Sequence, residues 1–138
     1  MQLLLKDDLP FVSVTVAYRG RQLQIPDILI DTGSASTILA ADQVAHIDLV
    51  PEPADVLKLI QGVGGTEAVF TRRIDHLQVD EQQLHEFEIE VGGLDYGFAI
   101  NGILGMDFLT QTHALIDLNH LQLRFEPLQP APHSDSPH

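Results

Sequence analysis

The chain has 138 residues, a mass of 15.2 kDa and a net charge of −13, from 7 Lys and Arg against 20 Asp and Glu. This length predicts a single domain that can bury a hydrophobic core, and 44% hydrophobic residues exclude compositional disorder. The acidic balance argues against binding to nucleic acid or to an anionic membrane, because phosphate groups would repel most of the surface. The absence of cysteine excludes disulfides and thiol catalysis. No signal peptide or membrane span is recognisable, so we expect a cytoplasmic protein.

Strand patterns dominate the first half of the chain. Valines alternate with small or polar residues over 12–17, as expected of a half-buried strand. Residues 18–21 indicate a turn, and Pro26 predicts an edge position or a bulge in the return strand. The apolar run 28–30 suits a short strand buried on both faces, whereas 38–47 has room for one or two helical turns.

Four further strands are expected after a loop that contains two prolines. They span 56–60, 66–70, 74–79 and 84–91. In the last of them, apolar residues alternate with Glu86, Glu88 and Glu90. This alternation predicts one buried face and one face of solvated carboxylates.

A short helix and a hairpin complete the expected domain. The helix is expected over 105–112 and the closing hairpin over 115–125. The residues of the helix expected to face the core are Met106, Phe108 and Leu109. The segment 127–138, rich in Pro, Ser and His, predicts a disordered tail. We therefore expect an all-β domain over 1–126 with one short helix near its C-terminus.

The sharpest motif is an Asp-Thr-Gly triplet at Asp31, Thr32 and Gly33, directly after the apolar run 28–30. The glycine permits a tight turn and the close approach of another backbone. The triplet by itself fits equally well an Asx-type turn, in which Asp31 accepts hydrogen bonds from nearby backbone N–H groups.

Two further motifs contain glycine. The segment Gly62, Val63, Gly64 and Gly65 predicts a hairpin tip whose backbone can approach a ligand, with an ordinary flexible hairpin as the alternative. A phosphate-binding loop is not favoured, because no Lys-Ser or Lys-Thr follows and no helix begins there. In the third motif, 103–105, Ile-Leu-Gly precedes the expected helix and by itself indicates core packing.

Taken together and in this order, the three motifs resemble those of the retropepsin-like, or retroviral-type, aspartic peptidases, over about residues 10–118. Asp31-Thr32-Gly33 looks like the catalytic triplet of the family, and the glycine-rich tip looks like its flap. The 103–105 motif resembles the apolar-apolar-glycine element that packs behind the catalytic loop. The resemblance implies an acid-protease-type β-barrel, closed or partly open, with a flap hairpin and one short C-terminal helix.

Aspartic peptidase chemistry needs two carboxylates that share one proton. The ionised carboxylate acts as a base toward water, and the protonated one polarises the substrate carbonyl. The chain contains a single Asp-Thr-Gly, so a working site needs a second copy, with two Asp31 residues meeting across a two-fold axis. We therefore expect a homodimeric endopeptidase that acts on a peptide or protein. The alternative is a catalytically silent retropepsin-like dimerisation or peptide-binding module.

No cofactor is expected. The histidines lack the i, i+4 spacing of a helical zinc pair, so we interpret them as surface residues and expect no metal site.

The resemblance also implies roles for individual residues. Asp31 activates the water, Thr32 forms hydrogen bonds across the dyad and Gly33 leaves room for the substrate backbone. Val63 and the glycines around it close over an extended peptide. The residues expected to line apolar subsites, which favour hydrophobic side chains on both sides of the cut bond, are Ile38, Ile60, Ile100 and Ile103.

Three positions depart from the retroviral pattern. Ser34 stands where many retroviral enzymes have Ala. A hydroxyl that donates to an ionised carboxylate stabilises the charged form, so Ser34 predicts a dyad that ionises at lower pH than in a Ser34→Ala variant. Ala35 and Met106 stand where the retroviral pattern has an Asp and an Arg that form an ion pair supporting the dimer. The joint absence of this Asp and Arg is consistent with an apolar contact in place of the ion pair, and it argues against the retroviral mode of dimerisation. Because the chain continues past Leu118, we expect a C-terminal hairpin to form the dimer sheet in place of short interleaved ends.

Overall fold

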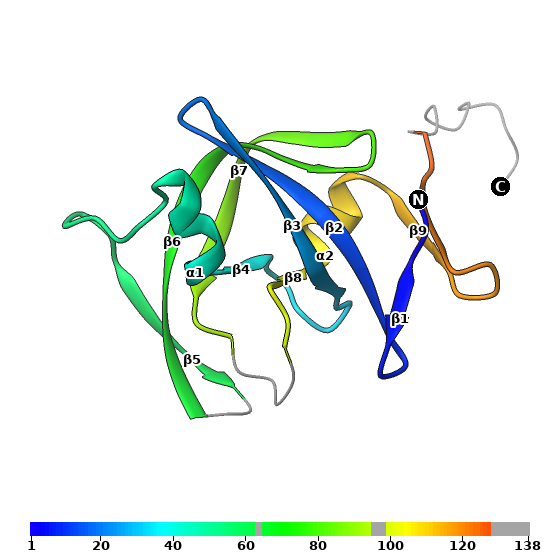
Figure 1. The fold of residues 1–138 in the computed structure, drawn as a ribbon, viewed down its shortest axis with the longest axis horizontal. Coiled ribbons are helices and arrows are strands. Elements are labelled where there is room, and N and C mark those ends of the chain that lie inside the picture. The colour runs from blue at the N-terminus through cyan, green and yellow to red at the C-terminus, as the bar shows by residue number, and fades with distance from the viewer. Residues whose placement is uncertain (63–64, 95–98, 128–138) are drawn as a thin grey trace, which may run out of the picture.

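The computed structural model describes residues 1–62, 65–94 and 99–127 and consists mainly of β-strands (Figure 1). Within these residues, one sheet contains eight strands in the spatial order β1-β2-β3-β8-β4-β7-β6-β5. Because β2 also pairs with β6, the six strands from β2 to β6 in that order close into a barrel, and β1 and β5 lie outside the ring. The strands are β1 (Leu4–Lys6), β2 (Leu9–Tyr18), β3 (Arg21–Ile30), β4 (Ile38–Ala40), β5 (Leu57–Gly62), β6 (Gly65–Val79), β7 (Gln82–Gly92) and β8 (Gly102–Leu104).

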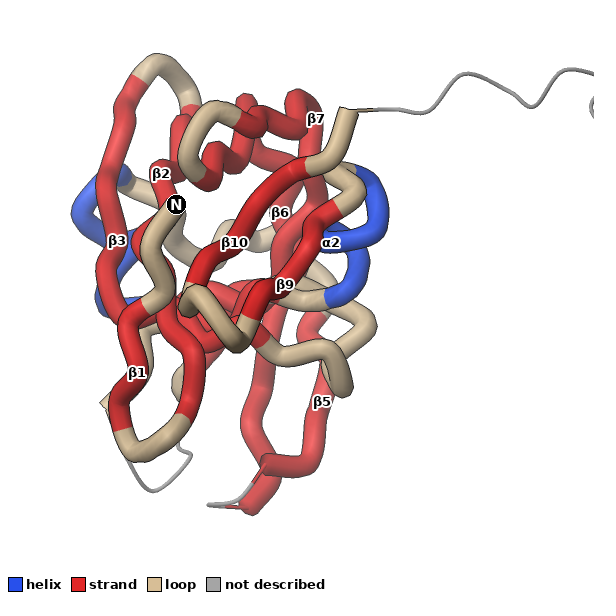
Figure 2. The backbone as a smooth tube through the Cα atoms, turned by 90° about the vertical axis from the view of Figure 1, so that its right-hand side faces the viewer, coloured by secondary structure: helices blue, strands red, loops and turns tan. Residues whose placement is uncertain are grey.

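Short helices and a separate hairpin complete the fold. Helix α1 (Ala41–Val44) and a 3-10 turn (Ala45–Ile47) follow β4, and α2 (Met106–Gln111) follows β8. Strand β9 (Ala114–Asp117) pairs antiparallel with β10 (Gln122–Phe125). Figure 2 shows this hairpin beside α2 and the N-terminal segment. The all-β class, the short helix and the closing hairpin are as the sequence predicts.

The bulge predicted at the proline is present. The register between β2 and β3 shifts between Val12 and Val14, so that Pro26 and Asp27 of β3 lie opposite the single Ser13 of β2. A proline has no N–H to donate to the hydrogen-bond ladder, and at a bulge the extra residue does not need to donate such a bond. After the bulge, β3 runs on as a strand buried on both faces, which leads directly into the triplet.

The break predicted within β6 is wrong. The sequence predicts separate strands at 66–70 and 74–79, whereas β6 is continuous through 71–73 and pairs with β7 throughout that segment. The polar residues 71–73 interrupt the apolar alternation, but Arg72 is accommodated because its guanidinium donates to the Tyr18 hydroxyl at 2.7 Å. A long charged side chain with a partner can thus occupy a barrel strand.

The core extends from the barrel interior to the inner face of α2. Phe108 is fully buried, and its ring lies edge-on to Phe87 and Phe125 at centroid distances of 5.9 and 6.5 Å. Leu109 is also buried, as expected. Met106 is exposed instead of facing the core, because it begins α2 on the rim of a surface hollow.

The N-terminal residues attach to the hairpin. The Leu3 N–H donates to the Leu121 carbonyl at 2.8 Å, and the Leu123 N–H donates to the Met1 carbonyl at 2.9 Å. Gln2 and Gln122 form an antiparallel bridge between these two bonds. The start of the chain thereby lies along one edge of the β9–β10 hairpin (Figure 2). None of the helices in the described ranges combines the length and apolar character needed to span a membrane.

Candidate active site

The Asp-Thr-Gly triplet is positioned by the strand pair beneath it. Strands β3 and β8 run parallel, with Ile30 opposite Leu104. The Asp31 N–H continues this ladder by donating to the Leu104 carbonyl at 3.1 Å. The first and third sequence motifs are therefore neighbours in space, and the carboxylate follows directly from a buried strand.

Gly105 lets the loop from Asp31 to Thr37 pack against the start of α2. A Cβ at this position would lie 2.3 Å from the Ser36 carbonyl oxygen and 3.0 Å from that of Ser34, distances at which backbone must move. The Met106 N–H donates to the Ser34 carbonyl at 2.8 Å, and the Asp107 N–H donates to the Ala35 carbonyl at 3.2 Å. Only glycine permits this close approach, so the Ile-Leu-Gly motif is more than core packing.

Thr37 and Asp107 fix the far end of the same loop. The Asp107 carboxylate accepts the Thr37 hydroxyl at 2.8 Å and the Thr37 N–H at 3.1 Å. The Thr37 hydroxyl oxygen in turn accepts the Gly105 N–H at 3.1 Å, and the threonine is completely buried. The sequence reasoning missed this pair, since an Asp in the first turn of a helix usually indicates only a favourable charge near the N-terminus.

Asp31 itself is half-buried, while Thr32 and Gly33 are exposed. One carboxylate oxygen of Asp31 accepts the Gly33 N–H at 2.9 Å, and the Asp31 carbonyl accepts the Ser34 N–H at 3.2 Å. The Asx-type turn that the triplet alone suggests is therefore present, and it presents the carboxylate at the surface of the single chain.

Ser34 does not contact the carboxylate. Its hydroxyl donates to the Ser36 carbonyl at 2.8 Å and closes the loop. The hydrogen bond from Ser34 to an ionised Asp31, on which the predicted pH shift depends, is absent from this geometry. In the structure Ser34 supports the loop instead.

The glycine-rich hairpin is described only in part. Strands β5 and β6 pair as far as Gly62 opposite Gly65, which confirms a hairpin. Val63 and Gly64 lie outside the described residues, and so does the side chain of Ile60. Their contact with a substrate stays a prediction.

The other expected subsite residues are buried in this chain. Ile100 and Ile103 pack with Phe11 and Leu29 in a small apolar cluster separate from the main core. Ile103 is only 1% exposed and presents no surface to a ligand in this conformation, and Ile38 is buried as well. A role in substrate binding stays a prediction for all three.

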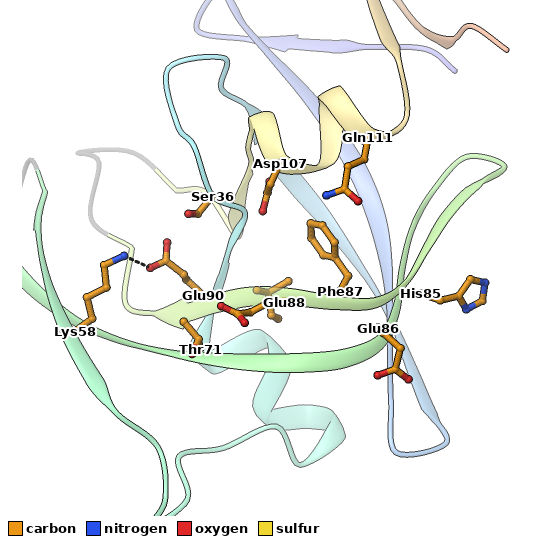
Figure 3. Close-up of a pocket in the computed structure, with 11 residues that line it drawn as sticks. Ser36, Lys58, Thr71, His85, Glu86, Phe87, Glu88, Glu90, Asp107 and Gln111 are labelled. Carbon is orange, nitrogen blue, oxygen red and sulfur yellow. Dashed lines mark hydrogen bonds and ion pairs between the residues drawn. The ribbon is translucent and has the colours of Figure 1, made fainter. Parts of the chain in front are cut away.

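A pocket of about 320 Å³ lies next to the loop from Asp31 to Thr37 (Figure 3). Ser36, α2 and β7 line it, and Lys58 of β5 reaches across to Glu90 at 3.1 Å. Glu86 and Glu88 are exposed as predicted, but Glu90 is only 7% exposed, so the expectation of three solvated carboxylates is wrong at this position. Glu90 lies where β7 passes beside β4, and the Lys58 ammonium compensates its charge.

No group of three or more histidine and acidic side chains within the described ranges is arranged to hold a metal ion. The absence of a metal requirement stays a prediction.

Comparison with known proteins agrees with this geometry. A protein-family model described as aspartyl protease matches residues 12–108, from within β2 to the first turn of α2. The chain belongs to the aspartyl protease family. The comparison with curated proteins gives no significant match.

Solved structures show the same fold. The retroviral protease-like domain of Ddi1 from Leishmania major is similar with a TM-score of 0.61 at 18% identity, covering 87% of this chain and 90% of that one. A retropepsin-like aspartic protease from Rickettsia conorii is similar with a TM-score of 0.63 at 14% identity, covering 88% of this chain and 95% of that one. At these identities the likeness establishes the retropepsin-like fold.

Proposed function

We propose that this aspartyl protease family member is a homodimeric endopeptidase in which Asp31 of each copy forms the catalytic dyad. One observation carries the proposal. The Asp31 carboxylate is presented at the surface by a loop held from behind through Leu104, Gly105 and the Thr37–Asp107 pair. A loop fixed at both ends positions a carboxylate reproducibly, as a reacting group requires.

The chemistry follows from two such carboxylates close together. Like charges a few ångströms apart do not both ionise, so the pair holds one proton and titrates as a unit. The ionised carboxylate takes a proton from water while the other donates a hydrogen bond to the scissile carbonyl. The attack gives a tetrahedral intermediate, and its collapse with protonation of the amine nitrogen releases both fragments. No covalent adduct with the enzyme forms.

The substrate is an extended peptide or a segment of a protein. Strands β5 and β6 form the hairpin expected to cover it, and an extended chain can bind beneath such a hairpin through backbone hydrogen bonds. We expect hydrophobic residues on both sides of the cleaved bond. The exposure of Thr32 and Gly33 beside the carboxylate supports access of a second chain to this point.

A peptide library tests the activity. Wild type and Asp31→Asn are incubated with a diverse peptide mixture from acidic to neutral pH, and cleavage is read by mass spectrometry at several protein concentrations. We expect Asp31→Asn to lower the cleavage rate by about a thousandfold or more. The rate in wild type should fall faster than linearly on dilution, because a separated copy holds half a site.

Asp75→Asn is the matched control. The Asp75 carboxylate also accepts a glycine N–H, that of Gly20 at 3.2 Å, but lies far from the triplet in the chain. It should leave cleavage unchanged. Equal cleavage by wild type and Asp31→Asn would refute the assignment of Asp31. A folded dimer that cleaves nothing would instead indicate the catalytically silent dimerisation or peptide-binding module.

A further inference from the structure

Strand β5 has a hydrogen-bonded ladder along one edge and an ion pair on one face. Its backbone pairs with β6 alone among the described residues. The Lys58 ammonium reaches from β5 to the Glu90 carboxylate of β7 at 3.1 Å, as Figure 3 shows. No other Lys, Arg or His in the described part of the chain lies within ion-pair distance of Glu90. The pair is therefore the ionic link between β5 and β7.

The carboxylate of this pair is buried, whereas its cation is not. The side chain of Glu90 is 9% exposed and that of Lys58 is 60% exposed. A carboxylate withdrawn from water needs a partner, so Glu90 holds the end of the long lysine side chain at one point. Replacing a buried ion pair by apolar residues is often neutral for stability. Stability alone therefore does not account for a charged pair at this place.

Glu90 is also bonded to the loop that carries Asp31. Its N–H donates to the Thr37 carbonyl at 2.9 Å, and Glu90 lies opposite Ile38 where β7 runs parallel to β4. Thr37 is the residue that Asp107 fixes from the other side. The path from β5 to the loop thus has two steps, which are the ion pair and one backbone hydrogen bond.

The gap that Lys58 crosses is the pocket of about 320 Å³ described above. Ser36 of the loop, Lys58 and Glu90 all contribute to its lining. Where a pocket separates two elements, direct side-chain packing does not fix the distance between them. A contact that spans the pocket then has a larger share in setting that distance.

We infer that Lys58 and Glu90 are positioning residues of the proposed peptidase: their ion pair fixes β5 relative to the loop that carries Asp31. The pair thereby sets how tightly a peptide is held between the strand and the loop. The inference rests on the proposed function, because the proposed substrate is what lies between them. The ground state and the transition state both need the peptide held, so loss of the pair should raise KM and leave kcat nearly unchanged.

Hydrogen exchange followed by mass spectrometry tests the attachment of β5 without any substrate. The double variant Lys58→Met with Glu90→Gln removes both charges and leaves no buried carboxylate without a partner. Exchange at residues 57–62 should be about fivefold faster than in wild type, because a strand that has lost a contact opens locally more often. Exchange at residues 114–125, in the β9–β10 hairpin, should not change.

Salt and a matched ion pair sharpen this test. Raising NaCl from about 0.05 M to about 0.5 M should speed exchange at 57–62 in wild type but not in the double variant, since salt screens a pair whose lysine is exposed. The control is Arg21→Met with Asp48→Asn. The Arg21 side chain is also 60% exposed and pairs with Asp48 at 3.0 Å, at the end of β3 away from Asp31. This control should leave exchange at 57–62 as it is in wild type.

Kinetics with a peptide that wild type cleaves tests the positioning role. The double variant should raise KM about fivefold with kcat within about twofold of wild type, whereas Lys58→Arg keeps the cation and should stay close to wild type. Lys58→Met alone leaves the Glu90 charge unpaired and should also lower the urea midpoint of unfolding. The double variant should recover the midpoint but not the KM. A purely structural pair would recover both.

Unchanged exchange at 57–62 in the double variant would overturn the inference, and so would a KM equal to that of wild type. The two proposals can fail separately. Cleavage that depends on Asp31 but has the same KM in the double variant would remove the role of the pair and keep the peptidase. A folded, dimeric wild type that cleaves nothing would remove the proposed activity and any role of the pair in it, while exchange would still decide whether the pair holds β5.

Discussion

The loop that carries Asp31 and the β5–β6 hairpin, which are the proposed catalytic loop and flap, are attached to the barrel in opposite ways. The loop from Asp31 to Thr37 is bonded to β8 and α2 through backbone groups at both ends, and Thr37 is completely buried. Strand β5 pairs with β6 alone among the described residues, and Leu57 and Leu59 on it are exposed. The fold therefore holds the loop that carries Asp31 by many contacts and the β5–β6 hairpin by few.

The difference lies in the base of the flap. The segment that leads into β5 is held by Arg72, whose guanidinium donates to Asp55 and, at 3.1 Å, to the Val50 carbonyl. This attachment is a partly buried ion pair, whereas the loop from Asp31 to Thr37 is held mainly by backbone hydrogen bonds and by the fully buried Thr37. An ionic contact is weakened by changes in pH and salt. A close backbone contact is weakened by a substitution that alters its packing or leaves a hydrogen-bonding group without a partner.

Gly105→Ala should have the largest effect of any single change in the loop. The added Cβ would meet the Ser36 carbonyl at 2.3 Å, so either the loop or α2 must shift. We expect a loss of about 3 kcal/mol or more in the free energy of unfolding, measured by urea denaturation, together with loss of cleavage.

Gly20→Ala separates this packing effect from backbone strain. Gly20 has a φ of +81° and no atom within 4 Å of its would-be Cβ, so its substitution should cost only about 1 kcal/mol. Equal costs for the two variants would contradict the packing explanation for Gly105.

Asp107→Ala should rank next. It leaves the buried Thr37 N–H and hydroxyl without their acceptor, which should lower the free energy of unfolding by about 3 kcal/mol. Because the loop then shifts, the cleavage rate should fall by roughly a hundredfold with little change in KM. Asp75→Ala removes the acceptor of one exposed backbone N–H and should cost under about 1 kcal/mol. Full activity of Asp107→Ala would show that the Asp31 loop is held without this pair.

The base of the flap should respond to pH. The hydrogen bond from the Glu52 N–H, together with the Arg72 guanidinium, outweighs burial and holds the pKa of Asp55 below its ordinary value of 3.8. A carboxyl group whose pKa is lowered by folding stabilises the folded chain at pH values above its ordinary pKa. This contribution is lost as the pH falls through the folded-state pKa. The stability difference between wild type and Asp55→Asn should therefore shrink below about pH 4.

Arg72→Met sharpens this test. The backbone donor to Asp55 remains, so the pH dependence should be reduced without vanishing. Its effect on the unfolding midpoint at neutral pH should be smaller than that of Asp107→Ala. Urea unfolding from neutral pH to about pH 3 gives both quantities, and a constant difference between wild type and Asp55→Asn over this range would contradict the pKa assignment.

The sequence predicts the parts of this fold that depend on local pattern. Alternation over 12–17, the proline at the bulge and the Gly105 motif are all signals carried by a few adjacent residues. The course of β6 through Arg72 could not be predicted in this way, because the partners that accommodate the Arg72 side chain, Tyr18 and Asp55, lie 54 and 17 positions away in the chain. Burial of Glu90 likewise depends on Lys58, 32 residues earlier in the chain.

The same limit applies within the site. The triplet identifies Asp31, but the Thr37–Asp107 pair joins residues 70 positions apart, and neither carries a motif of its own. Ser34 shows the converse case. A hydroxyl next to the triplet suggests a bond to the carboxylate, but the turn directs that hydroxyl to the Ser36 carbonyl.

Ser34→Ala should accordingly have the smallest effect. It removes one half-buried hydroxyl-to-carbonyl bond of 2.8 Å, which should cost about 1 kcal/mol of stability. Because that hydroxyl does not touch Asp31, the acid limb of the pH–rate profile should stay where it is in wild type. A limb that moves to higher pH in Ser34→Ala would show that the hydroxyl turns to the carboxylate in the dimer. The proposed catalytic loop would then be less rigid than its contacts with β8 and α2 imply. The difference in rigidity between this loop and the β5–β6 hairpin would be smaller.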